Sequence, residues 1–457
     1  LKLLEIVTHA ELDPLWGEDE TIGWVYQYFN SKDERREMRD VKAGGAQAPR
    51  NARELAVRNQ FFTPRYVVEF LTDNTLGRTW YEMRGGQTAL TESCRYLVWR
   101  PDEDIRTRPA KDPRELKVLD PACGSGHFLL YAFDLMAAIY REDWQSGGPL
   151  RRDYASSAEL DRALPGLILE RNLFGIDIDP RCAQIAALAL WMRAQRAFAE
   201  AGVPAHQRPE VRKTNIVVAE PMPGEADLMA EFSGSLEPPV LGRLVRTVAQ
   251  RMTLAGDLGS LLKIELAVQD AITEARRAWA SEQHTLPGIG APQADAMDLS
   301  GIDDAAFFEQ IEARLLDALS AYVHAGQGIT AARRRLFADD AAHALGFLAL
   351  MRQRYDVVLM NPPFGACSIK AKAAFERMYA RSKADVYAAM VERGLMLLEH
   401  RGMLGAITSR TGFFLSSFRK WREEAILTMS EPTLMADLGF GVLDAAVETS
   451  AYCLEVR

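Results

Sequence analysis

The sequence from residue 117 to residue 128 reads KVLDPACGSGHF. It opens with a short apolar run, Lys117 to Asp120, which is typical of a buried strand, and it leads into a helical pattern from Phe128 to Tyr140. Gly124 and Gly126 lie in the turn between them, where the missing Cβ lets a ligand approach the backbone. A strand, a glycine-containing turn and a helix in this order predict a ligand site at the carboxyl end of a parallel sheet.

Further apolar runs of strand length follow along the chain, at residues 173–177, 215–218, 355–360, 402–408 and 451–456. A helical pattern follows the run at 173–177, and another precedes the run at 402–408. Strands that alternate with helices predict an α/β fold, in which a parallel sheet is covered by helices on both faces.

The chain divides into four parts by pattern. Residues 1–58 are polar and helical, residues 59–221 hold the first three strands, and residues 353–457 hold the others. Residues 222–352 interrupt the sheet and are predicted to form a helical insertion, with a Gly-, Pro- and Asp-rich loop at 285–304.

The segment from Phe61 to Trp80 has the pattern of an amphipathic helix. Thr63 is expected to cap this helix, and Pro64 suits its first turn. The segment therefore predicts a helix that packs on the sheet before the first strand begins.

A second motif, GIDIDP, occupies residues 175–180. Asp177 ends the second strand, where a carboxylate can accept both hydroxyls of a ribose, and Ile178 is available to pack on an adenine ring. Asp179 is expected to cap the following helix. Two other interpretations stay open at this point: both aspartates could be caps, and the glycine turn could be an ordinary one. A dinucleotide-binding loop is disfavoured because its GxGxxG spacing is absent.

The most specific motif is DVVLMNPPFG at residues 356–365, in which a buried strand ends in a stiff turn. Asn361 offers a side-chain carbonyl, and Pro362 keeps its main-chain carbonyl although it has no N–H. Two oxygens that converge on an exocyclic amine would orient its lone pair for attack on a methyl sulfonium, and Phe364 offers a face on which a flipped base can stack. The alternative is that the segment is an ordinary proline-rich turn after a strand, in which Pro363 only stiffens the chain.

These motifs, in this order, resemble the gamma class of S-adenosylmethionine-dependent N6-adenine DNA methyltransferases. The resemblance implies a Rossmann-like methyltransferase sheet, with residues 59–221 as its cofactor-binding part and residues 353–457 as its catalytic part. It also implies S-adenosyl-L-methionine as cofactor. The implied catalytic residues are Asn361, Pro362, Pro363 and Phe364. The implied cofactor-binding residues are Phe62, Thr63, Asp120, Pro121, Ala122, Gly124, Gly126, Asp177, Ile178 and Asn215.

More narrowly, three segments resemble the PglX methyltransferases of BREX phage defence, with DISARM and type IIG methyltransferases close by. These segments are residues 23–28, 59–64 and 74–78. The resemblance implies site-specific methylation of double-stranded DNA, with other defence proteins as partners. It covers residues 20–220 and 351–457.

The sequence departs from the family pattern at three places. Relatives often have an aspartate after the third strand, where this chain has Asn215 and Glu220 nearby. Leu443 stands where relatives often place a second stacking aromatic, and Phe440 is the expected substitute. The chain ends at Arg457, where the family normally adds a target-recognition region.

The charge and the cysteine content indicate where the protein functions and what it can bind. The net charge is −9, which is unusual for a DNA-binding chain, but residues 361–425 hold 11 Lys and Arg against 6 Asp and Glu. That excess also fits an ordinary solvated helix face. The five cysteines form no CxxC pair, and no apolar run approaches the roughly 20 residues of a membrane span. We therefore expect a cytoplasmic protein with no metal site and no membrane contact.

Three other functions remain open from the sequence. Similar Asn-Pro-Pro loops also occur in enzymes that methylate RNA or a protein glutamine. A non-catalytic recruitment subunit could instead bind the cofactor without turnover. A loose PD…ExK nuclease pattern joins Pro101-Asp102 to Glu115 and Lys117, but Lys117 opens the first strand.

Overall fold

The computed structural model describes residues 8–12, 15, 21–27, 30–39, 48–59, 61–211, 213–237, 239–266, 268–273, 277, 304–324, 328–443 and 447–457. The chain forms two compact units, residues 1–216 with 354–457, and residues 217–353. The second unit spans nearly the same residues as the insertion expected at 222–352.

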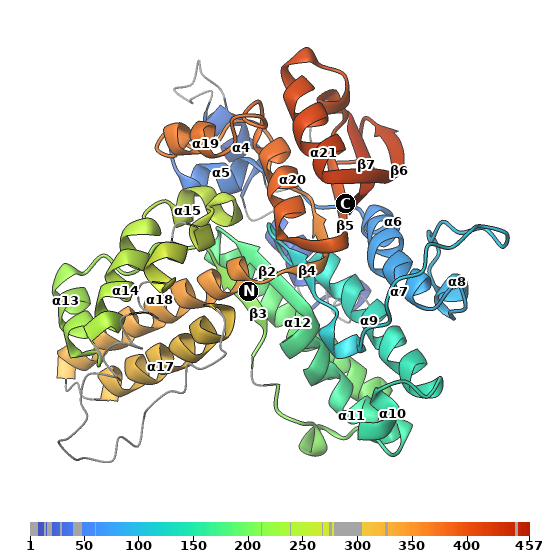
Figure 1. Ribbon diagram of the computed structural model, residues 1–457, viewed down its shortest axis with the longest axis horizontal. Helices are drawn as coiled ribbons and strands as arrows, with labels where there is room; N and C mark the ends of the chain where they lie inside the picture. Colours follow the sequence, from blue (N-terminus) through green and yellow to red (C-terminus); the bar gives the residue numbers. More distant parts are fainter. Residues whose placement is uncertain are drawn as a thin grey trace. The chain divides into compact units, whose positions relative to one another are not determined.

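A seven-stranded sheet lies at the centre of the first unit (Figure 1), with the order β3-β2-β1-β4-β5-β7-β6. The strands are β1 Val118–Asp120, β2 Leu173–Asp177, β3 Asn215–Val218, β4 Tyr355–Met360, β5 Leu398–Ser409, β6 Ser430–Gly439 and β7 Thr449–Val456. β1 runs parallel to β2 and β4, and β4 runs parallel to β5. The predicted α/β fold is therefore confirmed.

The far edge of the sheet differs from the expectation. β7 pairs antiparallel with both β5 and β6, whereas the alternation of strands and helices predicted a parallel sheet. β6 was not predicted, because its alternate residues are exposed and Pro432 interrupts it. Exposed residues and a proline are typical of an edge strand, which shows no continuous apolar run.

Helices of the first unit fill the connections between the strands. Before β1 they are η1 Ala10–Leu12, α3 Thr21–Gln27, α4 Lys32–Arg39, α5 Ala52–Arg58, α6 Arg65–Thr72, the π-helix η3 Asp73–Gly77, α7 Arg78–Met83, α8 Leu90–Ser93 and η4 Pro113–Glu115. Between β1 and β3 they are α9 His127–Gln145, α10 Leu150–Asp153, α11 Ser157–Leu167, η5 Ile168–Asn172, α12 Pro180–Glu200 and η6 Ala205–Gln207. After β4 they are α19 Lys372–Met378, α20 Val386–Leu397, η8 Arg410–Phe413, η9 Ser416–Phe418, η10 Trp421–Ile426 and α21 Leu427–Met429.

The expected cap of the helix before β1 was wrong. α6 begins at Arg65 with Pro64 at its N-cap position, and no side chain caps it. Thr63 lies outside the helix, and its hydroxyl accepts a hydrogen bond from Asn361 instead. The expected cap of α12 is confirmed, because the side chain of Asp179 accepts a hydrogen bond from the N–H of Arg181.

The second unit is helical. Its elements are α13 Ala226–Ser235, α14 Pro239–Arg251, α15 Ala255–Leu258, η7 Gly259–Leu261, α17 Asp304–His324 and α18 Gly328–Arg352. Phe232, Tyr322 and Phe337 form an aromatic cluster in its core, with ring centroids 5.5–6.0 Å apart. The loop expected at 285–304 lies, except for Asp304, outside the described residues.

A buried hydrogen bond joins α9 to the segments that lead into the sheet. The hydroxyl of Tyr140 donates to Oδ1 of Asn172 at 2.8 Å. The Asn172 amide in turn donates to the carbonyls of Pro113 and Leu116, each at 2.7 Å. The starts of β1 and β2 are thus tied to the helix that follows β1.

Tyr140→Phe is expected to lower the free energy of unfolding by about 1–2 kcal/mol, because the Asn172 oxygen would lose its partner in the interior. Urea unfolding followed by circular dichroism measures this change. An unchanged midpoint would show that Asn172 finds another donor.

Candidate active site

The glycine turn after β1 needs glycine at two positions for different reasons. Gly124 and Gly126 have φ values of +54° and +90°, in the left-handed region that side chains disfavour. A Cβ at Gly124 would meet nothing within 4 Å, so open space lies above this residue. A Cβ at Gly126 would lie 3.2 Å from the Cβ of Ala186 in α12. Gly124 therefore leaves room for a ligand, and Gly126 lets the helix approach.

Two carboxyl groups lie at the carboxyl ends of neighbouring strands. Oδ2 of Asp177 accepts the N–H of Gly124 and Oδ1 accepts the N–H of Asp179, both at 2.8 Å. Oδ1 of Asp120 accepts the N–H of Ala122 at 3.1 Å. Burial raises the pKa of Asp177 to about 6 and that of Asp120 to about 8. The glycine turn and the acidic turn are thus joined directly through Asp177, with buried Pro121 and half-buried Ile178 beside the two carboxyls.

Asn215 lies at the opposite end of its strand from Asp120 and Asp177. It is the first residue of β3, whereas Asp120 and Asp177 are the last residues of their strands. Its amide donates to the carbonyls of Leu169 at 3.1 Å and Glu170 at 2.9 Å. Because this amide ties the start of β3 to the chain before β2, the geometry does not support Asn215 as a cofactor ligand.

The side chain of Asn361 is held in one orientation at the end of β4. Its Nδ2 donates to the carbonyl of Phe61 at 3.3 Å and to Oγ1 of Thr63 at 3.1 Å. A main-chain carbonyl can only accept, so the NH₂ group must face Phe61. Oδ1 is buried and has no hydrogen-bond partner among the described residues. The amide therefore presents an unused acceptor.

The loop after Asn361 is fixed from two sides. The N–H of Phe364 donates to Oδ1 of Asn59, and the N–H of Gly365 donates to Oδ1 of Asp385, both at 2.8 Å. Asp385 also caps α20 through the N–H of Tyr387. Burial raises the pKa of Asp385 to about 7. Asn59 and Asp385 were not predicted as site residues, although Asp385 stands one residue before a predicted helix, where a cap is expected.

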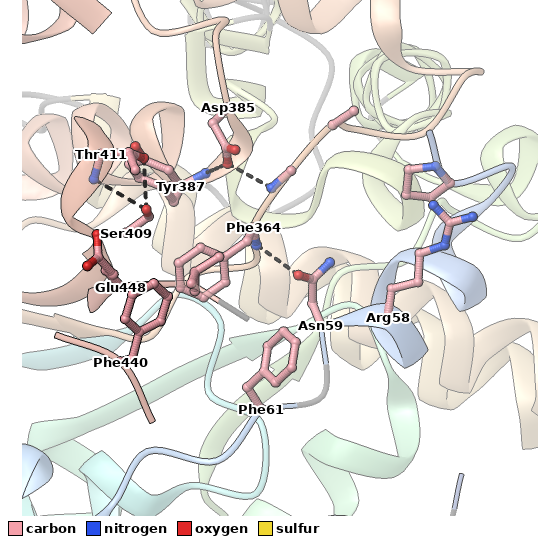
Figure 2. Close-up of a pocket in the computed structure, with 14 residues that line it drawn as sticks. Arg58, Asn59, Phe61, Phe364, Asp385, Tyr387, Ser409, Thr411, Phe440 and Glu448 are labelled. Carbon is pink, nitrogen blue, oxygen red and sulfur yellow. Dashed lines mark hydrogen bonds between the residues drawn. The ribbon is translucent and has the colours of Figure 1, made fainter. Parts of the chain in front are cut away.

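A pocket of about 570 Å³ opens beside this loop (Figure 2). It is lined by Pro49, Arg58, Asn59, Phe61, Phe364, Gly365, Ala366, Asp385, Tyr387, Ser409, Thr411, Phe440, Val447 and Glu448. Its volume lies within the range of small-molecule sites, about 300–1,000 Å³.

Aromatic rings form much of the pocket wall. The ring centroid of Phe364 lies 6.2 Å from that of Phe61 and 5.9 Å from that of Tyr387. Figure 2 shows the rings of Phe61, Phe364 and Phe440 gathered around one space. Phe440 is 71% exposed, whereas Leu443 is buried in the core. Phe440, not Leu443, is therefore the residue of this segment that lines the pocket.

Within the described part of the chain, one group of potential metal ligands gathers in the second unit, Glu220, Asp340 and His343, with ligand atoms within 4.8 Å of one another. Asp340 and His343 are exposed, and neither Asp102 nor Glu115 of the nuclease pattern joins such a group among these residues. None of the described helices has both the length and the apolar character of a membrane span.

Comparisons with known proteins give consistent matches. The Eco57I restriction-modification methylase family matches residues 171–435, and the DNA-methyltransferase domain of MmeI matches residues 109–215. The adenine-specific methyltransferase BrxX of Escherichia coli O9:H4 (strain HS) is 26% identical over 464 residues, which cover 96% of this chain and 33% of that protein. The adenine-specific methyltransferase PglX of Lacticaseibacillus casei (strain Zhang) is 26% identical over 470 residues, which cover 96% and 32%.

The chain thus spans about a third of the length of these curated relatives. A solved structure, a complex of DrdV with DNA, matches with a TM-score of 0.43 and 12% identity, and covers 96% of this chain and 29% of that one.

Proposed function

This chain belongs to the Eco57I restriction-modification methylase family, and from that premise we propose that it methylates the N6 amine of adenine in double-stranded DNA. The methyl donor is S-adenosyl-L-methionine, and the setting is a restriction-modification or phage-defence system with further protein partners. The observation that carries the proposal is the buried, unused Oδ1 of Asn361, which stands three residues before Phe364, a residue of the aromatic pocket wall.

The residues around the glycine turn fit the cofactor. The open space above Gly124 can admit a ligand against the backbone. A carboxylate offers about four lone pairs, and Asp177 does not use all of them on backbone N–H groups, so acceptor capacity remains for a ribose hydroxyl. Phe62, Thr63, Asp120 and Ile178 are proposed to complete the site, and S-adenosyl-L-methionine supplies the methyl group that the N6 nitrogen takes up.

The pocket beside Phe364 is proposed to receive the adenine after extrusion from the duplex, which costs a few kcal/mol. Phe364 and Phe440 stack on the base. Oδ1 of Asn361 and the carbonyl of Pro362 each accept a hydrogen bond from one N6–H group, which directs the nitrogen lone pair toward the methyl group. The methylated nitrogen then releases one of these protons to solvent. Asn59 and Asp385 hold the loop so that little reorganisation is needed, and positioning of this kind is a major source of rate enhancement.

The affinity for the cofactor is expected to rise as the pH increases from 5 to 7. Because the pKa of Asp177 is raised to about 6, the group is largely protonated at pH 5 and offers fewer acceptors to a ribose. Calorimetric titration with S-adenosyl-L-homocysteine across this range measures the change.

The contribution of Asp177 to the stability of the cofactor-free protein should have the opposite sign. Between the ordinary pKa of 3.8 and about 6, the folded state binds more protons than the unfolded state, so this contribution falls as the pH rises. An affinity independent of pH would contradict the assigned role of Asp177.

The proposed function is tested by mass spectrometry of host DNA for N6-methyladenine, with and without the gene. The whole protein should be used, because this chain spans about a third of its relatives. Methylation of RNA or protein glutamine, with unmodified DNA, would redirect the assignment. Cofactor binding without any turnover in the presence of partner proteins would identify a recruitment subunit.

A further inference from the structure

Helix α3 lies outside the sheet, yet it contacts the acidic turn after β2. The hydroxyl of Tyr26 donates to Oδ2 of Asp179 at 2.8 Å. The guanidinium of Arg181 lies over the Tyr26 ring, 5.6 Å from its centroid. Burial raises the pKa of Tyr26, so its hydroxyl stays protonated as a donor. One side of α3 is therefore anchored to the acidic turn by a charge-assisted hydrogen bond.

The same helix also lies directly against the glycine turn after β1. A Cβ at Gly23 would come within 2.8 Å of Oγ and 2.9 Å of Cβ of Ser125. Such distances are too short for real atoms, so only glycine lets the helix approach this closely. Ser125 is 4% exposed, and its Oγ has no hydrogen-bond partner among the described residues. The α3 backbone therefore covers the middle residue of the glycine turn.

These contacts close a ring around the cofactor turns. Tyr26 holds Asp179, whose N–H donates to Asp177, and Asp177 accepts the N–H of Gly124. Ser125, the next residue, lies under Gly23. The ring thus runs from α3 through both turns and back to α3.

A seven-residue helix is too short to be stable alone in water, so α3 depends on its contacts for its structure. Two of its large apolar residues face outward, since Trp24 is 41% and Val25 is 59% exposed. The contacts of Gly23 and Tyr26 with the two turns are consequently a substantial part of what fixes the helix.

We propose that α3 is a wall of the cofactor site, with Gly23 and Tyr26 as positioning residues that hold the two turns in register for S-adenosyl-L-methionine. The proposal rests on the proposed function in its choice of ligand. By linkage, a ligand that orders the two turns must also strengthen the docking of α3. Loss of that docking must in turn lower the affinity for the ligand.

The first test is Tyr26→Phe, measured by titration with S-adenosyl-L-homocysteine. Loss of a hydrogen bond to a charged group predicts a dissociation constant about 10-fold higher. The kcat at saturating cofactor should stay unchanged while the KM for S-adenosyl-L-methionine rises. Tyr140→Phe is the matched control, because it removes a buried hydroxyl bonded to Asn172 and should leave the dissociation constant unchanged.

The second test is a double-mutant cycle on Gly23 and Ser125. Gly23→Ala should raise the dissociation constant for S-adenosyl-L-homocysteine by about 10-fold or more when Ser125 is present. In a Ser125→Gly background, which lacks both atoms that the new Cβ would meet, the same change should have little effect. Equal effects of Gly23→Ala in both backgrounds would contradict the proposed role of the contact between Gly23 and Ser125.

The third readout is hydrogen exchange of residues 21–27 with and without S-adenosyl-L-homocysteine. Stronger protection of these amides in the complex is expected, and unchanged protection would contradict the linkage. If the wild-type protein fails to bind the ligand at all, the proposed function fails. If wild type binds and Tyr26→Phe binds equally well, only the role of α3 is refuted.

Discussion

Replacement of Asn361 by alanine should lower methylation of DNA adenine by roughly 100- to 1,000-fold, the loss typical for removal of one positioned hydrogen-bonding group in an active site. The wild-type amide holds Oδ1 buried and unused, so this acceptor is already oriented before any base arrives. Alanine removes it and leaves the N6 hydrogens with one carbonyl, that of Pro362. The loss should appear mainly in kcat, because Asn361 bonds to neither Gly124 nor Asp177 and touches the proposed cofactor site only through Thr63, so cofactor affinity should change far less.

Asn74→Ala is a suitable control for this variant. The Asn74 amide is also buried, and it donates to the carbonyls of Phe70 and Tyr96 at 2.8 and 2.7 Å. Its loss should lower stability without changing kcat. Methylation at the wild-type rate by Asn361→Ala, in the whole protein, would exclude the proposed mechanism.

The sequence identified the loop but not the orientation of its amide. A strand that ends in Asn-Pro-Pro-Phe is a local pattern, and so it could be recognised without any structure. The acceptors that orient Asn361 belong to Phe61 and Thr63, which lie about 300 residues earlier in the chain. Local reasoning gave Thr63 the role of a helix cap, because no pattern within its own segment reports a partner so distant.

The same distinction explains the other differences. The cap that Asp179 forms on α12 is a local contact with Arg181, and it was predicted correctly, whereas its bond to distant Tyr26 was not predicted. Asn59 holds Phe364 from a distant segment and was missed. β6 was missed for a different reason: an edge strand with exposed residues lacks the apolar run that marks the central strands.

Asp177 combines a predicted role with one that only the structure revealed, and this combination determines the effect of Asp177→Asn. The expected ribose contact needs free lone pairs on the carboxylate. The structure adds that both oxygens already accept backbone N–H groups, from Gly124 and Asp179. An asparagine has one oxygen, so its NH₂ group must face one of these N–H donors, and a buried donor without a partner costs about 1–3 kcal/mol.

Asp177→Asn should therefore raise the dissociation constant for S-adenosyl-L-homocysteine by roughly 100-fold. The substitution removes an acceptor for the ribose, and it breaks the bond that joins the glycine turn to the acidic turn. Asp73→Asn is the matched control, because buried Asp73 also accepts two donors, the N–H of Tyr96 and the hydroxyl of Tyr131. Each variant replaces a carboxylate that accepts hydrogen bonds on both of its oxygens. Both variants should therefore have a lower free energy of unfolding in a urea titration. Only Asp177→Asn should lose ligand affinity. Equal affinities for the two variants would mean that Asp177 only supports the fold, and the ribose site would then have to lie elsewhere.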